Sequence, residues 1–206
     1  MEMKGEQLVP ASQIQVWDAL NDPAILKECV PGCDSIDKLA DNEYQVLMVA
    51  RVGPVSAKFK GKLTISDQKP PDSYSIAFDG QGGVAGFGKG SANVSLAPEG
   101  DATRLSYAVK ATVGGKLAQI GSRLVDAAAR KIADSFFKAF NEKVGALAAH
   151  EQETKAEHAE HGGSGDHLPE PVPRDPDLPT VSSASIAFLA AGALVVVVVA
   201  LFALFG

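Results

Sequence analysis

Residues 116–149 carry the longest regular pattern in the sequence, and this pattern restricts the possible folds more than any other feature. The apolar residues of this stretch recur at steps of three and four, which places them on one stripe of an α-helix. They are Leu117, Ile120, Leu124, Ala128, Ile132, Phe136, Phe140, Val144 and Leu147. A helix of this length spans about 50 Å. A stripe that long needs a large apolar surface elsewhere in the domain to cover it.

The preceding residues predict a sheet that can supply this surface. A first strand is expected at 4–10. A helix with Ile14, Trp17 and Leu20 on one face follows it, and then a short helix at 24–29. Apolar and polar residues then alternate in further runs, as in half-buried strands, at 34–39, 44–52, 57–66, 74–80, 88–96 and 105–113. The short turns between these runs favour antiparallel neighbours. The sequence therefore predicts an α+β fold in which a curved antiparallel sheet wraps around the final helix.

The predicted inner face of this sheet mixes aromatic residues with glycine and alanine. Small residues opposite a helix leave space for a ligand, while glycines also allow a sheet to bend. The two interpretations are compatible, and the residues alone do not choose between them. If a cavity forms, it is expected to be lined by Tyr44, Met48, Phe59, Phe78, Ala92, Tyr107, Ala111, Leu117, Ile120 and Leu124.

The charges divide the chain into a neutral part and an acidic part. Residues 1–149 contain 17 basic and 17 acidic side chains, whereas 150–206 contain only Lys155 and Arg174 against eight acidic ones. A neutral domain is a poor match for nucleic acid, which is bound by neutralising phosphates. Residues 150–184 are rich in Glu, His, Gly and Pro, so a disordered linker is expected there. No fixed geometry gathers its histidines into a metal site.

The last residues, 185–206, contain no charged side chain. At 1.5 Å per residue they reach about 33 Å, enough to cross a hydrocarbon core of roughly 30 Å. The first residues lack the apolar segment of a signal peptide. We therefore predict three parts: a folded domain at 1–149, the linker at 150–184, and a transmembrane tail anchor at 185–206. This arrangement would hold the domain on the cytoplasmic side of the cytoplasmic membrane.

Two short motifs approach those of known binding sites but lack residues that such sites require. Residues 83–90 read G-V-A-G-F-G-K-G, which approaches a phosphate-binding loop, but a strand pattern follows where that loop requires a helix. Cys29 and Cys33 lack further ligands for a metal and are interpreted as packing residues. No catalytic residues and no metal site are predicted.

Lys58, Lys60 and Lys62 alternate along one expected strand, so their ammonium groups project from one outer face. Such a row is typical of a solvated face or of protection against edge pairing. A docking patch for an acidic partner or for an anionic membrane is the sharper hypothesis.

Five longer motifs occur together in the first two thirds of the chain. They are G-E-Q-L-V-P-A-S with V-W-D-A-L-N-D-P at 5–23, C-V-P-G-C at 29–33, V-G-P-V-S-A-K-F-K-G at 52–61, G-x-G-x-G-S-A-x-V-x-L at 86–96, and V-G-G-K-L-A-Q-I-G-S-R-L-V-D-A-A-A-R-K-I-A-D at 113–134. In this combination the chain resembles the carbon monoxide dehydrogenase G-subunit family, over about residues 1–145. The resemblance implies a helix-grip, START-like fold with a hydrophobic cavity between sheet and helix. It also implies association with a molybdenum-containing CO dehydrogenase at the cytoplasmic membrane. The family offers no catalytic residues to carry over, and many members lack a membrane tail, so the tail rests on this sequence.

Three hypotheses of different classes follow. In the first, a membrane-anchored accessory protein binds a lipophilic molecule, such as menaquinone or another isoprenoid quinone, and brings it to the dehydrogenase; no covalently bound cofactor is expected. In the second, the domain is a docking adaptor whose interior is filled by side chains. In the third, it is an enzyme of the START-like group, although no acid–base or nucleophile–base pair stands out. A bound lipid would favour the first hypothesis over the second, and turnover of a small substrate would favour the third.

Overall fold

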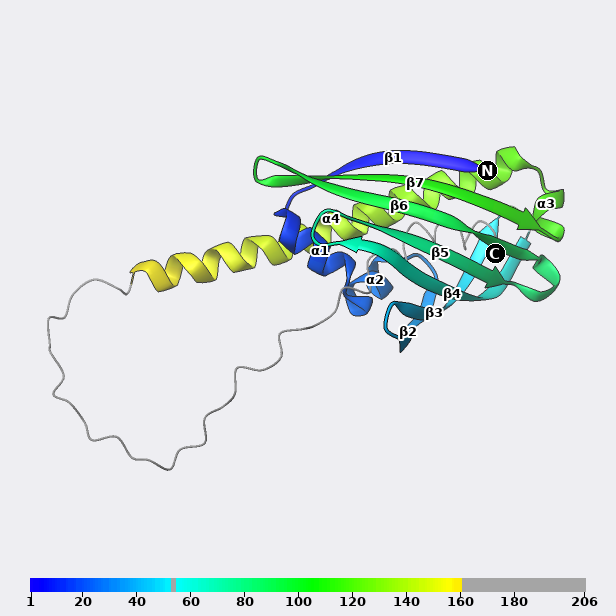
Figure 1. Ribbon diagram of the computed structural model, residues 1–206, viewed down its shortest axis with the longest axis horizontal. Helices are drawn as coiled ribbons and strands as arrows, with labels where there is room; N and C mark the ends of the chain where they lie inside the picture. Colours follow the sequence, from blue (N-terminus) through cyan, green and yellow to red (C-terminus); the bar gives the residue numbers. More distant parts are fainter. Residues whose placement is uncertain (53–54, 161–206) are drawn as a thin grey trace, which may run out of the picture.

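The computed structural model describes residues 1–52 and 55–160 as a single curved sheet with helices on one face (Figure 1). The elements are β1 (Glu2–Val9), α1 (Gln13–Leu20), α2 (Pro23–Cys29), β2 (Cys33–Ala40), β3 (Glu43–Val52), β4 (Val55–Lys69), β5 (Ser73–Gln81), η1 (Gly83–Ala85), β6 (Phe87–Glu99), β7 (Ala102–Gly114), α3 (Lys116–Gln119) and α4 (Ser122–Glu160). The strands form one antiparallel sheet in the order β1-β7-β6-β5-β4-β3-β2. The α+β helix-grip architecture predicted from the sequence is confirmed.

Two short helices, α1 and α2, follow β1 and begin with side-chain caps. The Ser12 hydroxyl accepts from the Gln15 backbone N–H, and the Gln15 side chain accepts from the Ser12 backbone in return, which satisfies donors that the first turn leaves free. The Asp22 carboxylate caps α2 by accepting from the backbone N–H groups of Ala24 and Ile25, and Pro23 occupies the first helical position. Trp17 is buried as expected, but Ile14 is 65% exposed, so its assignment to the buried face was wrong.

The alternation predicted for β3 to β7 is confirmed by burial, whereas burial in β2 does not alternate and Leu39 is 55% exposed. In β4, Phe59, Leu63 and Ile65 are buried on the inner face, while Lys58 and Lys60 are exposed on the other. The motif at 83–90 forms η1 and the start of β6, so a strand follows it and not the helix of a phosphate-binding loop. The sheet thus presents one apolar face to the helices and one polar face to solvent, as antiparallel sheets commonly do.

The long helix differs from its prediction at its start. A single helix was expected from residue 116, but α3 ends at Gln119 and α4 begins only at Ser122. Gly121 lies between them at φ 91, a left-handed conformation that glycine adopts without steric cost and that interrupts a right-handed helix. The chain therefore turns at an elbow formed by Ile120 and Gly121.

The buried stripe of α4 differs from the predicted one in its first half. The residues buried in α4 are Val125, Ala129, Ala133, Phe136, Phe137, Phe140, Val144 and Ala148. Leu124 and Leu147, both expected on the stripe, are 54% and 44% exposed. Steps of four advance about 400° in a helix of 3.6 residues per turn, so Leu124, three such steps before Phe136, lies about 120° away from it around the helix axis. The prediction is correct at Phe136, Phe140 and Val144, which are buried.

The C-terminal parts of the chain are described only in part. Helix α4 continues to Glu160, past residue 150, where the linker is predicted to begin. The rest of the expected linker and the expected anchor at 185–206 lie outside the described residues. None of the helices within 1–52 and 55–160 combines the length and the apolar character that crossing a membrane requires.

Candidate functional site

A row of three glycines crosses the inner face of the sheet. The strand register places Gly61 of β4 opposite Gly80 of β5, and Gly80 opposite Gly88 of β6. Val46 and Val113 close the row on β3 and β7. All three glycines are buried. No side chain therefore rises from the sheet in the middle of this row.

Aromatic rings fill the space beside other small residues. A Cβ added to Gly82 would overlap the Phe59 ring, at 1.2 Å from its nearest carbon, and one added to Gly90 would lie 2.7 Å from the Phe78 ring. At these two positions the absence of a side chain makes room for a neighbouring ring. On the helix side, Phe137 stacks on Tyr107 with ring centroids 5.4 Å apart, and Phe136 stacks on Phe140 at 5.2 Å.

The residues predicted to line a cavity fall into two groups. One group is buried between sheet and helix and consists of Tyr44, Met48, Phe59, Phe78, Ala92, Tyr107, Ala111 and Leu117. Met48 lies directly opposite Phe59 across β3 and β4, so the structure brings these two together. The second group lies at the elbow: Ile120 is half-buried and packs against the core, whereas Leu124 points to solvent and does not join it.

An apolar hollow of about 240 Å³ opens where the elbow meets the edge of the sheet. It is lined by Met1, Val113, Ala118, Ser122, Val125 and Asp126. Val113 also ends the glycine row, so the hollow and the row share a wall. Ala118, Ser122 and Val125 were not predicted as lining residues, because their approach to Val113 depends on the break at Gly121.

Burial keeps the ionisable groups of the interior neutral. It raises the pKa of Tyr44 to about 12, with a smaller contribution from Asp41. The pKa of Tyr107 is also raised, mainly by burial and further by Asp134. The pKa of each thiol, Cys29 and Cys33, is raised to about 11, again mainly by burial. Protonated thiols are poor nucleophiles, so the local environment favours a packing role for both cysteines.

Metal-ligating side chains are scattered across the described structure. Within 1–52 and 55–160, no three or more His, Cys, Asp or Glu side chains are grouped so that they could hold a metal ion. The inner face is mainly apolar and includes the buried tyrosines Tyr44, Tyr74 and Tyr107.

The lysines proposed as a docking patch share the exposed outer face of β4, and two of them form ion pairs within the domain. Lys58 contacts Asp34 at 2.9 Å, and Lys62 contacts Glu43 at 2.9 Å. Exposed pairs of this kind stabilise a fold by at most about 1 kcal/mol, so both ammonium groups remain available to a partner at little cost.

Several solved structures share this fold. A conserved protein from Geobacillus kaustophilus is 30% identical with a TM-score of 0.67, and the match covers 70% of this chain and 95% of that one. A protein from Mycobacterium smegmatis (16% identity, TM-score 0.54, 71% and 92% covered) and one from Nitrosomonas europaea (14%, 0.52, 76% and 97%) are similar in fold alone. Among curated proteins, no sequence matches this chain.

The family comparison agrees with the motifs found in the sequence. The model that describes the G-subunit of carbon monoxide dehydrogenase, CoxG, matches residues 5–145, which run from β1 into the middle third of α4. The match includes the glycine row, the elbow and the hollow beside it, and it covers more than half of the chain. The chain therefore belongs to the CoxG family of carbon monoxide dehydrogenase.

Proposed function

We propose that this protein is a membrane-tethered accessory of a molybdenum-containing CO dehydrogenase that binds an isoprenoid quinone, such as menaquinone, and presents it to the enzyme. Family membership connects the chain with carbon monoxide dehydrogenase in an accessory role. The lipophilic ligand, the tether and the identity of the quinone are the proposed parts.

The observation that carries the proposal is that Val113 borders both the glycine row and the apolar hollow at the elbow. Gly61, Gly80 and Gly88 contribute no side chains to the inner face. In this proposal, an apolar molecule enters at the hollow and extends past Val113 toward the row. Ligand sites in proteins are commonly concave and mostly apolar, as this one is.

A quinone suits such a site for a physical reason. Its isoprenoid chain is too apolar to leave a bilayer unaided, because exposing apolar surface to water is unfavourable. Electrons from a soluble dehydrogenase must reach the respiratory chain, and a domain that shields the quinone from water would allow them to do so. The proposed anchor at 185–206 would keep the domain beside the membrane that holds the quinone.

The segment between α4 and the proposed anchor fits this role. Residues 161–184 would reach roughly 27 Å as a flexible coil of about 24 residues, and more where proline extends them. The domain could then move between the bilayer and an enzyme docked nearby without leaving the membrane.

The experiment that tests the proposal blocks the hollow. Ala118→Trp places an indole in the hollow beside the elbow, on an exposed position of α3. The control, Leu147→Trp, adds the same indole to a separate hollow of about 190 Å³ between α1, α2 and α4. Native mass spectrometry of protein purified from its own membranes should detect a bound quinone in the unmodified protein and in the control, and little in Ala118→Trp.

Two results would contradict the carrier function. The first is an unmodified protein without any bound lipid, and the second is an Ala118→Trp variant that retains as much as the control. Deleting 185–206 tests the tether separately: the deleted protein should move to the soluble fraction, whereas pelleting with membranes would show that the domain itself binds lipid.

The docking adaptor remains a second candidate because of one observation. Rings occupy the space beside Gly82 and Gly90, as a filled interior would require. Ala92→Leu and Ala111→Leu separate the two candidates: in a filled core each should cost roughly 1–3 kcal/mol through overpacking. In a core with a ligand cavity, each should displace the lipid at a much smaller cost. If the adaptor acts through the row of Lys58, Lys60 and Lys62, changing all three to Glu should weaken co-purification with the dehydrogenase, most at low salt.

A further inference from the structure

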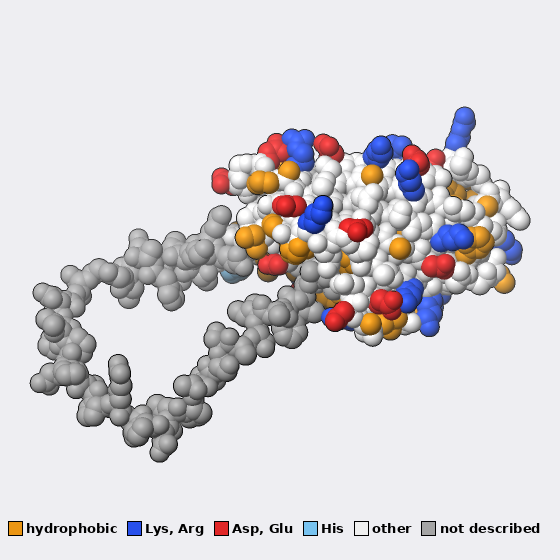
Figure 2. All heavy atoms as spheres, viewed as in Figure 1, with side chains coloured by type: hydrophobic (Ala, Val, Ile, Leu, Met, Phe, Trp, Pro, Cys, Tyr) orange, Lys and Arg blue, Asp and Glu red, His pale blue; other side chains and the backbone are white. Residues whose placement is uncertain are grey.

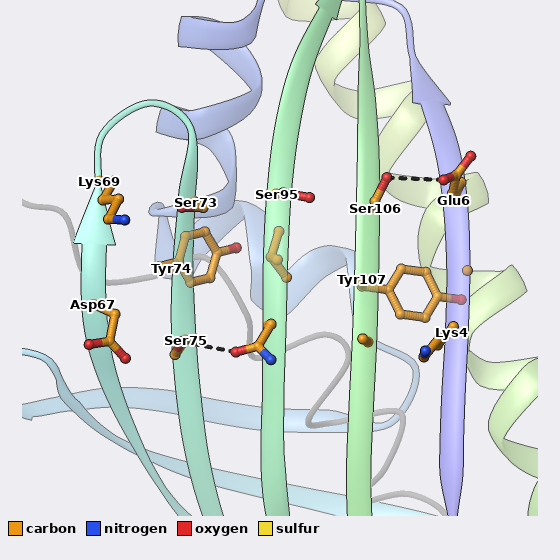
Figure 3. A pocket seen from close by; sticks show the side chains of 14 residues that line it. Lys4, Glu6, Asp67, Lys69, Ser73, Tyr74, Ser75, Ser95, Ser106 and Tyr107 are labelled. Atoms are coloured by element: carbon orange, nitrogen blue, oxygen red, sulfur yellow. Dashed lines mark hydrogen bonds between the residues drawn. The ribbon is translucent and has the colours of Figure 1, made fainter.

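A further hollow lies on the opposite side of the sheet from the proposed ligand site. It has a volume of about 650 Å³ and spans β4, β5, β6, β7 and β1 on the face turned away from the helices (Figure 3). Its floor consists of short side chains, whereas charged side chains stand at its two edges. It belongs to the solvent face and so is separate from the interior considered above.

Two rows of paired residues build this hollow. In the first, Lys69 lies opposite Ser73, Ser73 opposite Ser95, Ser95 opposite Ser106, and Ser106 opposite Glu6. The hydroxyl group of Ser106 donates to Glu6 at 3.4 Å. A basic group therefore stands at one edge, an acidic group at the other, and three serines lie between them.

The second row reverses the order of charge. Ser75 lies opposite Asn93, Asn93 opposite Ala108, and Ala108 opposite Lys4. Asp67 stands at the far edge, in the bulge of β4 next to these rows. Here the acidic group is on β4 and the basic group on β1. Lys4 and Lys69 form no ion pair with any residue in the described part of the chain.

The balance of these charges decides what kind of partner fits. Two cations and two anions surround the hollow, and acidic and basic side chains are interspersed over this face as a whole (Figure 2). An anionic membrane, a nucleic acid or an acidic peptide would meet as much repulsion as attraction. A surface on which opposite charges occupy opposite edges is complementary to itself.

We propose that this face of the sheet binds a second copy of the same chain, with a two-fold axis that runs along β6. Because β6 is the middle strand of the five, rotation about it places β4 of one copy over β1 of the other. Lys69 then faces Glu6 of the second copy, and Asp67 faces Lys4. Each pair occurs twice, as the symmetry of such an interface requires. The short serine and alanine side chains of the floor let the two sheets approach, with bridging water between the hydroxyl groups.

The choice of this axis rests on the proposed membrane anchor. Rotation about a strand keeps both copies of α4 pointing the same way, because α4 lies along the sheet on its other face (Figure 1). Both chains then leave the dimer at the same end, which two anchors in one membrane require. An axis across the strands would also pair opposite charges but would send the two C-terminal segments in opposite directions.

The extent of the face predicts a weak dimer. Five strands and about six residues of each cover roughly 24 Å by 20 Å, or about 500 Å² per copy, which is below the size of a standard interface. Two chains held in the same membrane meet at a raised effective concentration, so weak contacts are sufficient there. Binding of this kind would respond strongly to single changes of charge.

A mixing experiment with the full chain in detergent tests the arrangement. Lys69→Glu and Glu6→Lys should each weaken self-association at least tenfold, because each creates two repulsive contacts. Mixed together, the two variants should associate about as well as the unmodified chain, since the new carboxylate at position 69 of one copy then faces the new ammonium group at position 6 of the other. Lys131→Glu, the same change of charge on the exposed side of α4, is the control and should have no effect.

Every alternative outcome counts against the proposal. An unmodified chain that stays monomeric at all concentrations overturns it, as do single variants that associate normally. Weak single variants that fail to recover on mixing overturn the pairing of β4 with β1. Self-association is measured without reference to a bound quinone, whereas the carrier function is tested by the lipid found in native mass spectrometry. A failure of one proposal can therefore be told from a failure of the other.

A cross-linking experiment covers the case in which Glu6→Lys disturbs the fold through its neighbour Arg104, which contacts Glu6 at 3.2 Å. Ser95 lies on the proposed axis, so Ser95→Cys should be linked to its own copy by a short bis-maleimide in native membranes. Ser66→Cys, two strands away on β4, would lie roughly 19 Å from its copy and should not be linked. Equal linking at both positions, or none at Ser95→Cys, contradicts the proposed interface.

Discussion

The two faces of the sheet are built from the same strands but follow different rules. On the inner face, large rings lie beside residues without side chains: Phe59 beside Gly82, and Phe78 beside Gly90. On the outer face, short polar residues such as Ser95 form a floor between charged edges. The inner face is buried beneath the helices, whereas the outer face is open to solvent.

Because of this difference, a substitution should affect stability on one face and association on the other. Successive residues of a strand point to opposite faces, so neighbours in the sequence belong to different environments. A change on the inner face alters the free energy of unfolding, because packing and buried hydrogen bonds are lost. A change on the outer face should leave stability almost constant and alter association. Pairs of substitutions, one in each environment, test this division through the free energy of unfolding.

Removing a buried ring from the core between helix α4 and the inner face should have the largest effect on stability. Phe140 on α4 is fully buried and stacks on Phe136. Phe140→Ala should lower the free energy of unfolding by about 4 kcal/mol, because both transfer free energy and packing are lost. Urea unfolding measures this. Leu147→Ala, on the same helix but 44% exposed, is the control and should cost less than about 1 kcal/mol. Equal losses would show that the sheet-facing stripe of α4 is misplaced.

Adding one methyl group to the inner face should have the next largest effect. In Gly90→Ala, the new Cβ would lie 2.1 Å from the Lys110 carbonyl oxygen, a backbone atom that cannot easily move. We expect a loss of about 2–3 kcal/mol through overpacking. Gly145→Ala is the matched control: its Cβ meets only Pro10, at 3.3 Å, and the change favours a helix by up to about 1 kcal/mol. If both variants unfold at the same urea concentration, the structure around Gly90 has room for a methyl group and the prediction is wrong.

A hydroxyl group on each face allows a finer comparison. The Thr103 hydroxyl is fully buried and donates to the Ala11 carbonyl oxygen at 2.8 Å, which joins β7 to the start of α1. Thr103→Val should cost about 1–2 kcal/mol, because that carbonyl loses its partner. Ser106→Ala removes an exposed hydroxyl from the outer face and should cost less than about 0.5 kcal/mol. A larger effect at Ser106 would break the division between the faces.

The strands could be predicted because each is governed by a local pattern. In β4 the alternation of Phe59 and Leu63 with Lys60 and Lys62 is enough to assign both faces. The glycine row could not be found in this way. It depends on the register that aligns Gly61, Gly80 and Gly88, which turns and bulges set across three strands.

The start of the helix was harder to predict because one residue interrupts it. Gly121 is a single glycine in an otherwise regular apolar pattern, and such residues are often tolerated inside helices. Here it adopts φ 91 and separates α3 from α4. The hollow beside Val113 was missed for the same reason. The outer hollow was missed because serines on a solvent face resemble any exposed strand.

The smallest expected effect on stability at neutral pH concerns the two thiols. Cys29 is buried and Cys33 half-buried, and burial raises the pKa of each from 9.0 to about 11. An unfolded thiol ionises near pH 9 while the folded one stays protonated, so the native state holds more protons between these values. The stability gained in this way is complete below pH 9 and is lost as the pH rises toward 11.

Alkylation by iodoacetamide measures the ionisation of the two thiols directly, because only the thiolate reacts. In the folded protein the rate should still rise through pH 9 and level off near pH 11. In the same protein dissolved in urea it should level off near pH 9. A folded protein that reaches its plateau near pH 9 would place the thiols in water, and the comparison between the faces would not extend to the loop between α2 and β2.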